Sequence, residues 1–191
     1  DMPFVLMLDE DENGYKAGRF LRASDLGIKS ENGEWKPVIH DAISHKLVVP
    51  NGTMGQRWEE GKQWNLKLET EDGSKIDPAL SVAEEEYELQ TIQFPYFDSQ
   101  GDGIFERPIP TKKVKLADGK EVRIATVYDL MASQYGIKRF GHELEAKSYE
   151  DSESKYTPAW QENVTGIKQE LVTQVAREFA QNAIAVSYTH L

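Results

Sequence analysis

The sequence contains no cysteine among its 191 residues. This absence excludes disulfide bonds, thiolate zinc sites, cysteine-ligated iron–sulfur clusters and cysteine nucleophiles from the chemistry of this chain by itself. Basic side chains are also scarce, because 22 Lys and Arg stand against 33 Asp and Glu and leave a net charge of −11. A surface of that sign repels phosphate backbones, so nucleic acid is a poor candidate partner.

Long apolar runs are missing as well. The longest, residues 4–8 and 183–186, are far shorter than the roughly 18 residues that a membrane span needs. No basic region followed by an apolar stretch stands at the N-terminus, so no signal peptide is visible. We expect a chain without a membrane span and, because it begins Asp1-Met2-Pro3, a piece of a longer protein.

Motifs for nucleotide binding and serine hydrolysis are absent too: the sequence has no Gly-x-Gly-x-x-Gly, no phosphate-binding loop and no nucleophile elbow. Residues 51–53 and 163–165 match the pattern of glycosylation acceptors. Without a secretory signal that match carries little weight.

Two acidic turns imitate the first half of a calcium loop. Residues 9–14 (DEDENG) and 98–103 (DSQGDG) alternate oxygen-bearing side chains before a glycine. The glutamate that closes such a loop at its twelfth position is replaced by Phe20 in the first and Ile109 in the second. Turn propensity alone explains this composition, so acidic solvent-facing turns are favoured over calcium sites.

The four histidines show no paired metal-ligand spacing; they are His40, His45, His142 and His190. Ordinary surface or hydrogen-bonded histidines are the favoured interpretation. For His142, in a loop next to a glycine, two alternatives stay open: packing within the loop, or facing a cleft.

The first two thirds of the chain predict short strands. Residues 4–8 indicate a buried strand that needs cover on both faces, and residues 113–116 and 121–124 flank an Asp-Gly turn typical of a hairpin. Further short strands are expected at 20–23, 35–40 and 46–49, and residues 72–86 and 98–103 are expected to be mobile surface loops.

Helices are expected afterwards. Residues 126–135 have a possible capping box, and Thr157 followed by Pro158 favours a helix start that Gly166 ends. The last helix is predicted from apolar residues repeated every four positions, Ile167, Leu171, Val175, Phe179 and Ala183. The predicted fold class is therefore mixed α/β, with a strand-rich part at 1–125 and a helical part at 126–184.

Several stretches together resemble one known family. They are residues 1–3 (DMP) and 5–8 (VLML), 17–26 (AGRFLRASDL), 49–52 (VPNG), 94–97 (FPYF), 116–119 (LADG), 126–130 (TVYDL), 156–160 (YTPAW) and 176–180 (AREFA). In this order and approximate spacing they are similar to the catalytic alpha subunit of respiratory (dissimilatory) nitrate reductase, of the molybdopterin oxidoreductase superfamily. That subunit is several times longer, so residues 1–184 resemble an interior segment of it.

The resemblance implies a function for the parent protein. It implies an α/β multi-domain subunit with a bis-molybdopterin guanine dinucleotide molybdenum centre and one 4Fe-4S cluster, which reduces nitrate to nitrite. It further implies an iron–sulfur beta subunit and a quinol-oxidising membrane gamma subunit as partners, at the cytoplasmic face of a bacterial cell membrane. Nitrite oxidoreductase and chlorate or selenate reductase are the neighbouring alternatives.

The resemblance assigns no catalytic, cofactor-binding or metal-binding residue within this chain. In the family the His/Cys cluster motif and the aspartate that ligates molybdenum precede the matching segment, so residues 1–191 alone are expected to be inactive, a structural or binding module. After residue 184 the family continues into a Gly-rich strand that meets the pterin. Residues 185–191 (AVSYTHL) depart from that pattern, and we expect a foreign, cloning-derived or assembly-derived tail outside the fold.

Overall fold

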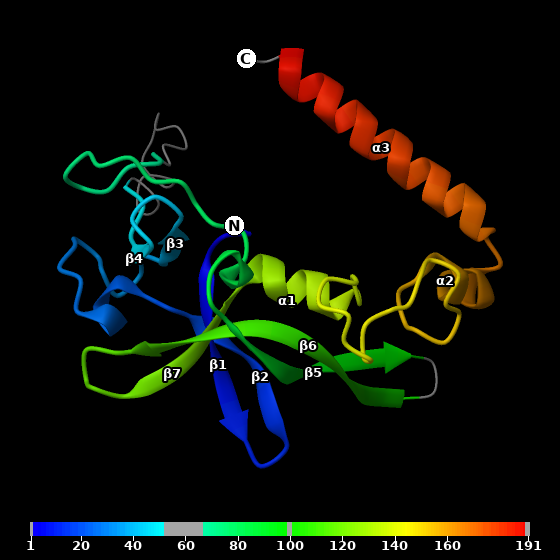
Figure 1. Cartoon of the computed structure of the whole chain (residues 1–191), viewed down its shortest axis with the longest axis horizontal. Coiled ribbons are helices and arrows are strands. Elements are labelled where there is room, and N and C mark those ends of the chain that lie inside the picture. Colours follow the sequence, from blue (N-terminus) through cyan, green and yellow to red (C-terminus); the bar gives the residue numbers. More distant parts are fainter. Residues whose placement is uncertain (1, 52–66, 99–100, 190–191) are drawn as a thin grey trace. The chain divides into compact units, whose positions relative to one another are not determined.

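A computed structural model describes residues 2–51, 67–98 and 101–189; the side chains of 96–98, 101, 102 and 186–189 lie outside that description (Figure 1). The chain forms two compact units, Asp1–Met131 and Ala132–Leu191. They are called unit 1 and unit 2 below.

Unit 1 contains a closed sheet of five strands. Its members are β1 (Val5–Asp11), β2 (Gly14–Phe20), β5 (Glu88–Asp98), β6 (Gly101–Lys115) and β7 (Glu121–Thr126), paired in the order β1-β2-β5-β6-β7. All described pairs are antiparallel except β2 with β5, in which Tyr15 lies opposite Ile92. Closure of a sheet leaves fewer strand edges exposed to other chains.

Strand β1 is covered on both of its faces, as its apolar run predicts. Val5 and Met7 pack in one core cluster together with Leu21 and Ile124. Leu8 joins a second cluster, in which Ile92, Phe94, Ile109 and Leu130 are also buried. Because neighbouring side chains of a strand point to opposite faces, this one strand serves two cores.

The β6–β7 hairpin confirms the expectation for residues 113–124. Lys113 lies opposite Arg123 and Lys115 opposite Glu121. At the turn, Gly119 has a φ of 87°, and the Asp118 carboxylate accepts a hydrogen bond of 2.9 Å from the Lys120 N–H. The positive φ explains the glycine at this position.

The other short strands are only partly as expected. A two-stranded sheet joins β3 (Ile39–Asp41), which extends one residue past the predicted range, and β4 (Lys46–Val48), which lies within it. The expected strand at 20–23 is wrong, because Phe20 ends β2 and the 3-10 helix η1 (Ala23–Leu26) follows. Residues 35–38 form no strand, only an isolated bridge from Pro37 to Arg22, and a proline lacks the N–H that a sheet ladder needs.

The expectation of surface loops holds only in part: most of residues 72–86 are exposed or half-buried and outside strands, and 99–100 lie outside the described residues. Within residues 72–86, Ile76, Ala79 and Val82 are buried, and η3 (Val82–Glu84) forms a 3-10 turn. Apolar residues scattered among acidic ones are therefore part of the core. Residues 98 and 101–103 belong to the ends of β5 and β6, with Asp98 opposite Gly101.

Three helices follow the strands: α1 (Val127–Gln134), α2 (Pro158–Thr165) and α3 (Gln169–Thr189). The Thr126 hydroxyl accepts a hydrogen bond of 3.0 Å from the Asp129 N–H at the start of α1. Thr157 does the same for Trp160 at the start of α2, at 3.1 Å, and Gly166 ends that helix with a φ of 74°. Side-chain oxygens satisfy N–H groups that a helix start leaves free.

Helix α3 extends further than its apolar spacing predicts. It begins at Gln169 and continues to Thr189, past the expected end near residue 184. Backbone hydrogen bonding propagates a helix without a continuing apolar stripe, which explains the difference. The mixed strand-and-helix composition confirms the fold class. Within the described residues, no helix has the length and apolar character that crossing a membrane requires.

Candidate functional site

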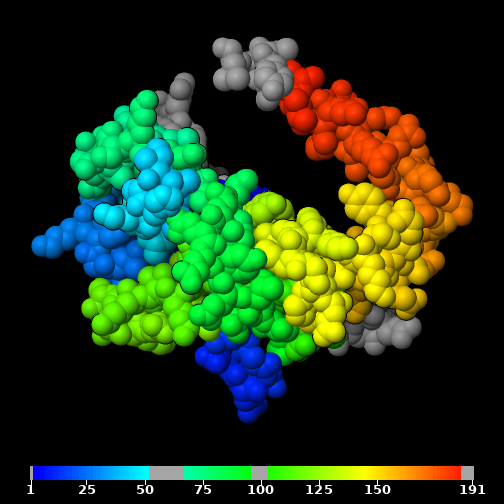
Figure 2. Space-filling model, viewed as in Figure 1, coloured from blue at the N-terminus to red at the C-terminus, as the bar shows by residue number. Residues whose placement is uncertain are grey.

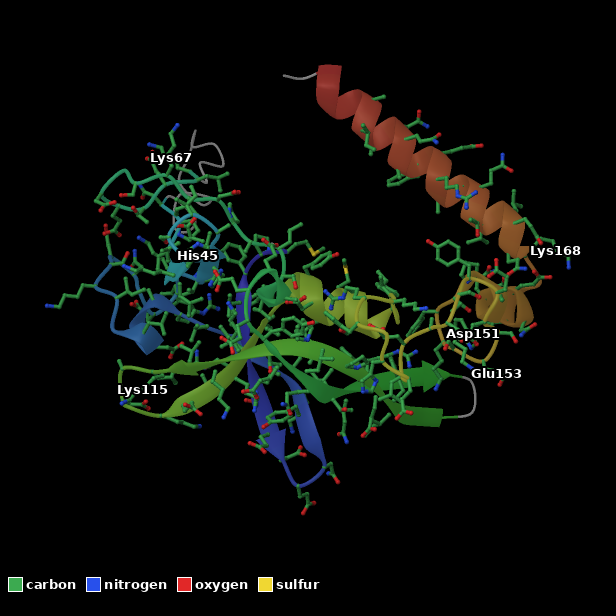
Figure 3. All side chains as sticks on the ribbon, in the orientation of Figure 1. His45, Lys67, Lys115, Asp151, Glu153 and Lys168 are labelled. Carbon is green, nitrogen blue, oxygen red and sulfur yellow. The ribbon has the colours of Figure 1, made fainter. Side chains whose placement is uncertain are left out.

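A group of ionisable side chains in unit 1 surrounds Glu85. We call it the Glu85 cluster: His40, His45, Glu85 and Lys112. Lys112 of β6 and the Nδ1 atom of His45 both contact the Glu85 carboxylate, and the Nε2 atom of His40 lies 3.4 Å from it. His45 stands at the β3–β4 turn (Figure 3). The cluster therefore ties the small sheet to the closed sheet.

The cluster keeps its carboxylate ionised. The hydrogen bond from Lys112, helped by the contact with His45, lowers the pKa of Glu85 to about 2 against the opposing effect of burial. Burial lowers the pKa of His40, and the positive charge of Lys112 acts in the same direction. At neutral pH the cluster thus holds one anion, one lysine cation and a buried neutral His40.

Asp41 anchors the same hairpin where β3 enters the turn. Burial would raise its pKa, but hydrogen bonds from the Ser44 side chain and from the N–H groups of Asp77, Ser44 and Ile43 lower it to about 2. The Asp77 N–H donates at 2.8 Å and the Ser44 N–H at 2.9 Å. A carboxylate with several donors of this kind is a structural anchor.

These groups do not form an acid–base pair suited to catalysis. A general base works best with a pKa near the operating pH, and a carboxylate with a pKa of about 2 is too weak a base. His40 is only 6% exposed, which leaves little room for a substrate. The Glu85 cluster holds strands together, and we assign it no chemistry.

A hollow of about 1060 Å³ lies beside strands β1, β2 and β7. Two ion pairs lie within its lining: Arg19 forms two hydrogen bonds of 2.7 Å with Asp25, and Lys113 lies 3.6 Å from Glu121. Arg123 contacts Glu88 at 2.8 Å. Five acidic and five basic side chains line the hollow, so its net charge favours a ligand of neither sign.

The first calcium-like motif forms the turn of the β1–β2 hairpin. This hairpin projects from unit 1 and is drawn in dark blue in Figure 2. The Asp11 carboxylate accepts hydrogen bonds from the Asn13 N–H at 2.8 Å and from Lys16 at 2.9 Å. The hydrogen bond from Lys16 lowers the pKa of Asp11. Phe20 lies in β2 opposite Leu6.

The second calcium-like motif lies partly outside the described residues, as do 52–53 of the first glycosylation pattern and His190. Ile109, at its twelfth position, is buried in β6 opposite Gln90. Across the described ranges, no three His, Asp or Glu side chains gather in a way that could hold a metal ion. Asn163 is an exposed residue of α2.

His142 packs within its own loop, one of the two alternatives left open by the sequence. Its Nδ1 atom accepts a hydrogen bond of 3.2 Å from the Leu144 N–H. Its own N–H donates to Glu145 at 3.0 Å, and Arg139 and Phe140 donate to the same carboxylate. Burial would raise the pKa of Glu145, but these backbone hydrogen bonds lower it.

No sequence motif predicts a role for Glu85, and only a weak one concerns Glu145. Glu85 stands in a run of three glutamates and is 40 residues from the histidine it contacts. Only the pairing of β3 with β4 and the position of β6 bring the Glu85 cluster together. For Glu145, a nearby glycine that favours a tight loop is the one available hint.

The comparisons with known proteins found no matching family model. The chain is 46% identical over 185 residues to the nitrate reductase alpha chain of Bacillus subtilis (strain 168). It is 37% identical over 196 residues to the respiratory nitrate reductase 1 alpha chain of Escherichia coli (strain K12), and 37% over 195 residues to a nitrate reductase alpha subunit of Mycobacterium tuberculosis. The resemblance to nitrate reductase alpha subunits is confirmed.

Each of these matches covers 96% of this chain. The chain in turn spans only 15–16% of the length of these relatives. It therefore matches one segment of these alpha subunits.

Proposed function

We propose that the parent protein is the catalytic alpha subunit of a respiratory nitrate reductase, which reduces nitrate to nitrite. One observation carries the proposal: relatives named nitrate reductase alpha chain match 96% of this chain at up to 46% identity. A match of this extent involves both units of the fold rather than one motif.

The proposed reaction consumes two electrons and two protons for each nitrate and yields nitrite and water. A bis-molybdopterin guanine dinucleotide molybdenum centre would supply the oxygen-atom transfer, and a 4Fe-4S cluster would supply electrons. The residues of this chain do not fit the role of ligands, because it lacks cysteine and its described residues contain no metal-binding group of three. We therefore propose that the ligands belong to other segments of the subunit.

The proposed role of this segment is structural. Its ionised carboxylates, Asp41 and Glu85, already have hydrogen-bond donors within the fold, so they support strands rather than a substrate. In isolation the chain is a non-catalytic module. In the parent it would help to build the protein shell around the cofactor.

The proposed partners are an iron–sulfur beta subunit and a quinol-oxidising membrane gamma subunit. The word "respiratory" in the names of two relatives supports a role in respiratory electron transport. The proposed location is the cytoplasmic face of the cell membrane. The gamma subunit would provide the membrane attachment.

The test is an assay of the purified parent complex with nitrate and a reduced viologen as electron donor. We expect nitrite formation by the complex and none by residues 1–191 alone. A molybdenum-loaded complex that fails to reduce nitrate would contradict the proposal. Faster turnover of chlorate or selenate, or net oxidation of nitrite, would favour the alternative reductases or a nitrite oxidoreductase.

For residues 185–191 we propose an origin outside the parent gene. The share of this chain outside each match, 4% of 191 residues or about eight, is close to the size of this tail. Reading the parent gene from an independent DNA library tests the idea. The same seven codons at that place would contradict it.

A further inference from the structure

Helix α3 carries an apolar stripe that nothing in the described part of unit 2 covers well. We define the α3 stripe as Ile167, two residues before the helix begins, with Leu171, Val175 and Phe179 of the helix itself; these residues are 48%, 54%, 56% and 77% exposed. With Val172 and Ala176 they line a shallow hollow of about 500 Å³ that contains no charged side chain. Figure 1 shows α3 as one long helix that follows α2.

The other side of α3 is polar. Glu170, Gln174, Glu178 and Gln181 line a separate hollow of about 580 Å³, and Gln174 donates a hydrogen bond of 2.8 Å to Glu178. A helix with one apolar and one polar side normally buries its apolar side against a core. A continuous exposed apolar patch therefore marks a surface that docks against something.

A second copy of this chain is a poor occupant. Each copy carries a net charge of −11, which opposes close approach of two copies. Four large apolar side chains offer only a few hundred Å² of contact, whereas a stable interface buries about 800 Å² on each partner.

A lipid surface is a poor occupant too. Helices that lie on membranes usually have a polar side rich in Lys and Arg. Between Gln169 and Thr189, α3 has Arg177 as its one basic residue and two acidic ones, Glu170 and Glu178. The polar side thus lacks the charge that attracts anionic lipids.

A segment of the same subunit meets neither objection. The relatives match 96% of this chain and extend far beyond it, since the chain spans 15–18% of their length. Docking within one covalent chain avoids most of the loss of translational and rotational freedom that a separate partner faces. A stripe of this size is then sufficient.

We infer that the α3 stripe is an intramolecular docking face, covered by an apolar part of the same alpha subunit that lies outside residues 1–191. The inference depends on the length of the relatives and on the chemistry of α3. It does not depend on nitrate as the substrate, so its failure is separable from failure of the nitrate reductase proposal.

The absence of cysteine allows a direct test by thiol labelling. Val175→Cys places a thiol in the stripe, and Gln181→Cys places a matched control on the polar side of the same helix. Each variant is prepared in residues 1–191 and in the full-length alpha subunit without its partner subunits. Maleimide labelling rates of the α3 peptide are then followed by mass spectrometry.

We expect Val175→Cys to react rapidly in residues 1–191 and at least about tenfold more slowly in the full-length subunit. Equal rates in the two proteins would overturn the inference. Slow labelling of Val175→Cys already in residues 1–191 would also overturn the inference. If that protection does not depend on protein concentration, unit 1 covers the stripe; if it does, a second copy covers it. Protection that requires the partner subunits would overturn it as well.

A second pair of variants tests the inference independently, in case the cysteine variants fail to fold. Phe179→Asp should lower the thermal midpoint of the full-length alpha subunit by several degrees while leaving the helix content of residues 1–191 unchanged. Gln181→Asp should leave both quantities unchanged. An unaltered midpoint for Phe179→Asp would contradict the proposed cover.

Discussion

The two units of this chain use apolar residues differently. Unit 1 encloses its own, because two clusters around β1 bury residues such as Val5, Ile92 and Ile109 completely. In unit 2, the buried apolar residues described are Ala132 and Ala146, and the large ones of the α3 stripe stay exposed. A regular apolar spacing therefore predicts a helix and which side of it is apolar. It does not predict whether the same segment contains a core that buries that side.

The comparison predicts its largest effect for truncation of core side chains. Ile109→Ala in unit 1 should destabilise residues 1–191 by about 2–5 kcal/mol, because it empties a fully buried site. Val175→Ala in unit 2 should change the unfolding free energy by about 0.5 kcal/mol or less. Urea unfolding of both variants checks the pair, and similar losses would show that the α3 stripe is already packed.

The next effect concerns a buried carboxylate of unit 1. Asp129 is fully buried and accepts hydrogen bonds from the Ser81 hydroxyl at 2.6 Å and the Val82 N–H at 3.0 Å. Asp129→Ala should cost about 2–3 kcal/mol, because buried hydrogen-bond donors lose their acceptor. Asp118→Ala, at the exposed β6–β7 turn, is the control, and urea unfolding measures both variants. An equally small loss of unfolding free energy in both would contradict the role of Asp129.

A pH effect is also expected in unit 1. The pKa of His40 is lowered in the folded chain, so folding favours its neutral form among Glu85, Lys112, His45 and Asp41. The contribution of neutral His40 to folding stability is fully present above the ordinary histidine pKa of about 6.5. It is lost as the pH falls from there through the lowered pKa of His40 in the folded chain. Chemical unfolding from pH 7.5 to pH 5 should show declining stability.

The His40→Gln variant tests the assignment of this pH effect. It should flatten the decline, while His142→Gln, in the loop of unit 2, should keep it. At lower pH, protonation of Glu85 and Asp41, with pKa values of about 2, removes a further contribution that is fully present above their ordinary values. An unchanged slope in His40→Gln would refute the assignment.

The smallest global effect is expected at the start of α2. The Thr157 hydroxyl accepts from the Trp160 N–H, and its loss in Thr157→Ala should weaken the local helix by about 1 kcal/mol. Because unit 2 has little core of its own, the main unfolding transition should hardly move. Faster hydrogen exchange confined to residues 157–166 is the expected result, and a large shift of the main transition would contradict the comparison.

Local signals explain which features the sequence could predict. The Asp-Gly turn of the β6–β7 hairpin and the caps Thr126 and Thr157 depend on residues a few positions apart. The pairing of β1 with β7, in which Val5 lies opposite Thr126, joins residues more than a hundred positions apart and leaves no comparable signal. The Glu85 cluster and the burial of Ile76 and Val82 likewise depend on contacts between residues far apart in the sequence.

Hydrogen exchange of residues 1–191, followed by mass spectrometry, tests the contrast between the two units most directly. We expect amides of β1, β6 and β7 to exchange at least about a hundredfold more slowly than those of α3, because only the strands are held by a complete core. The same experiment on the full-length alpha subunit should bring α3 close to the strands. Amides of α3 that are as protected as those of β1 in residues 1–191 alone would contradict the account.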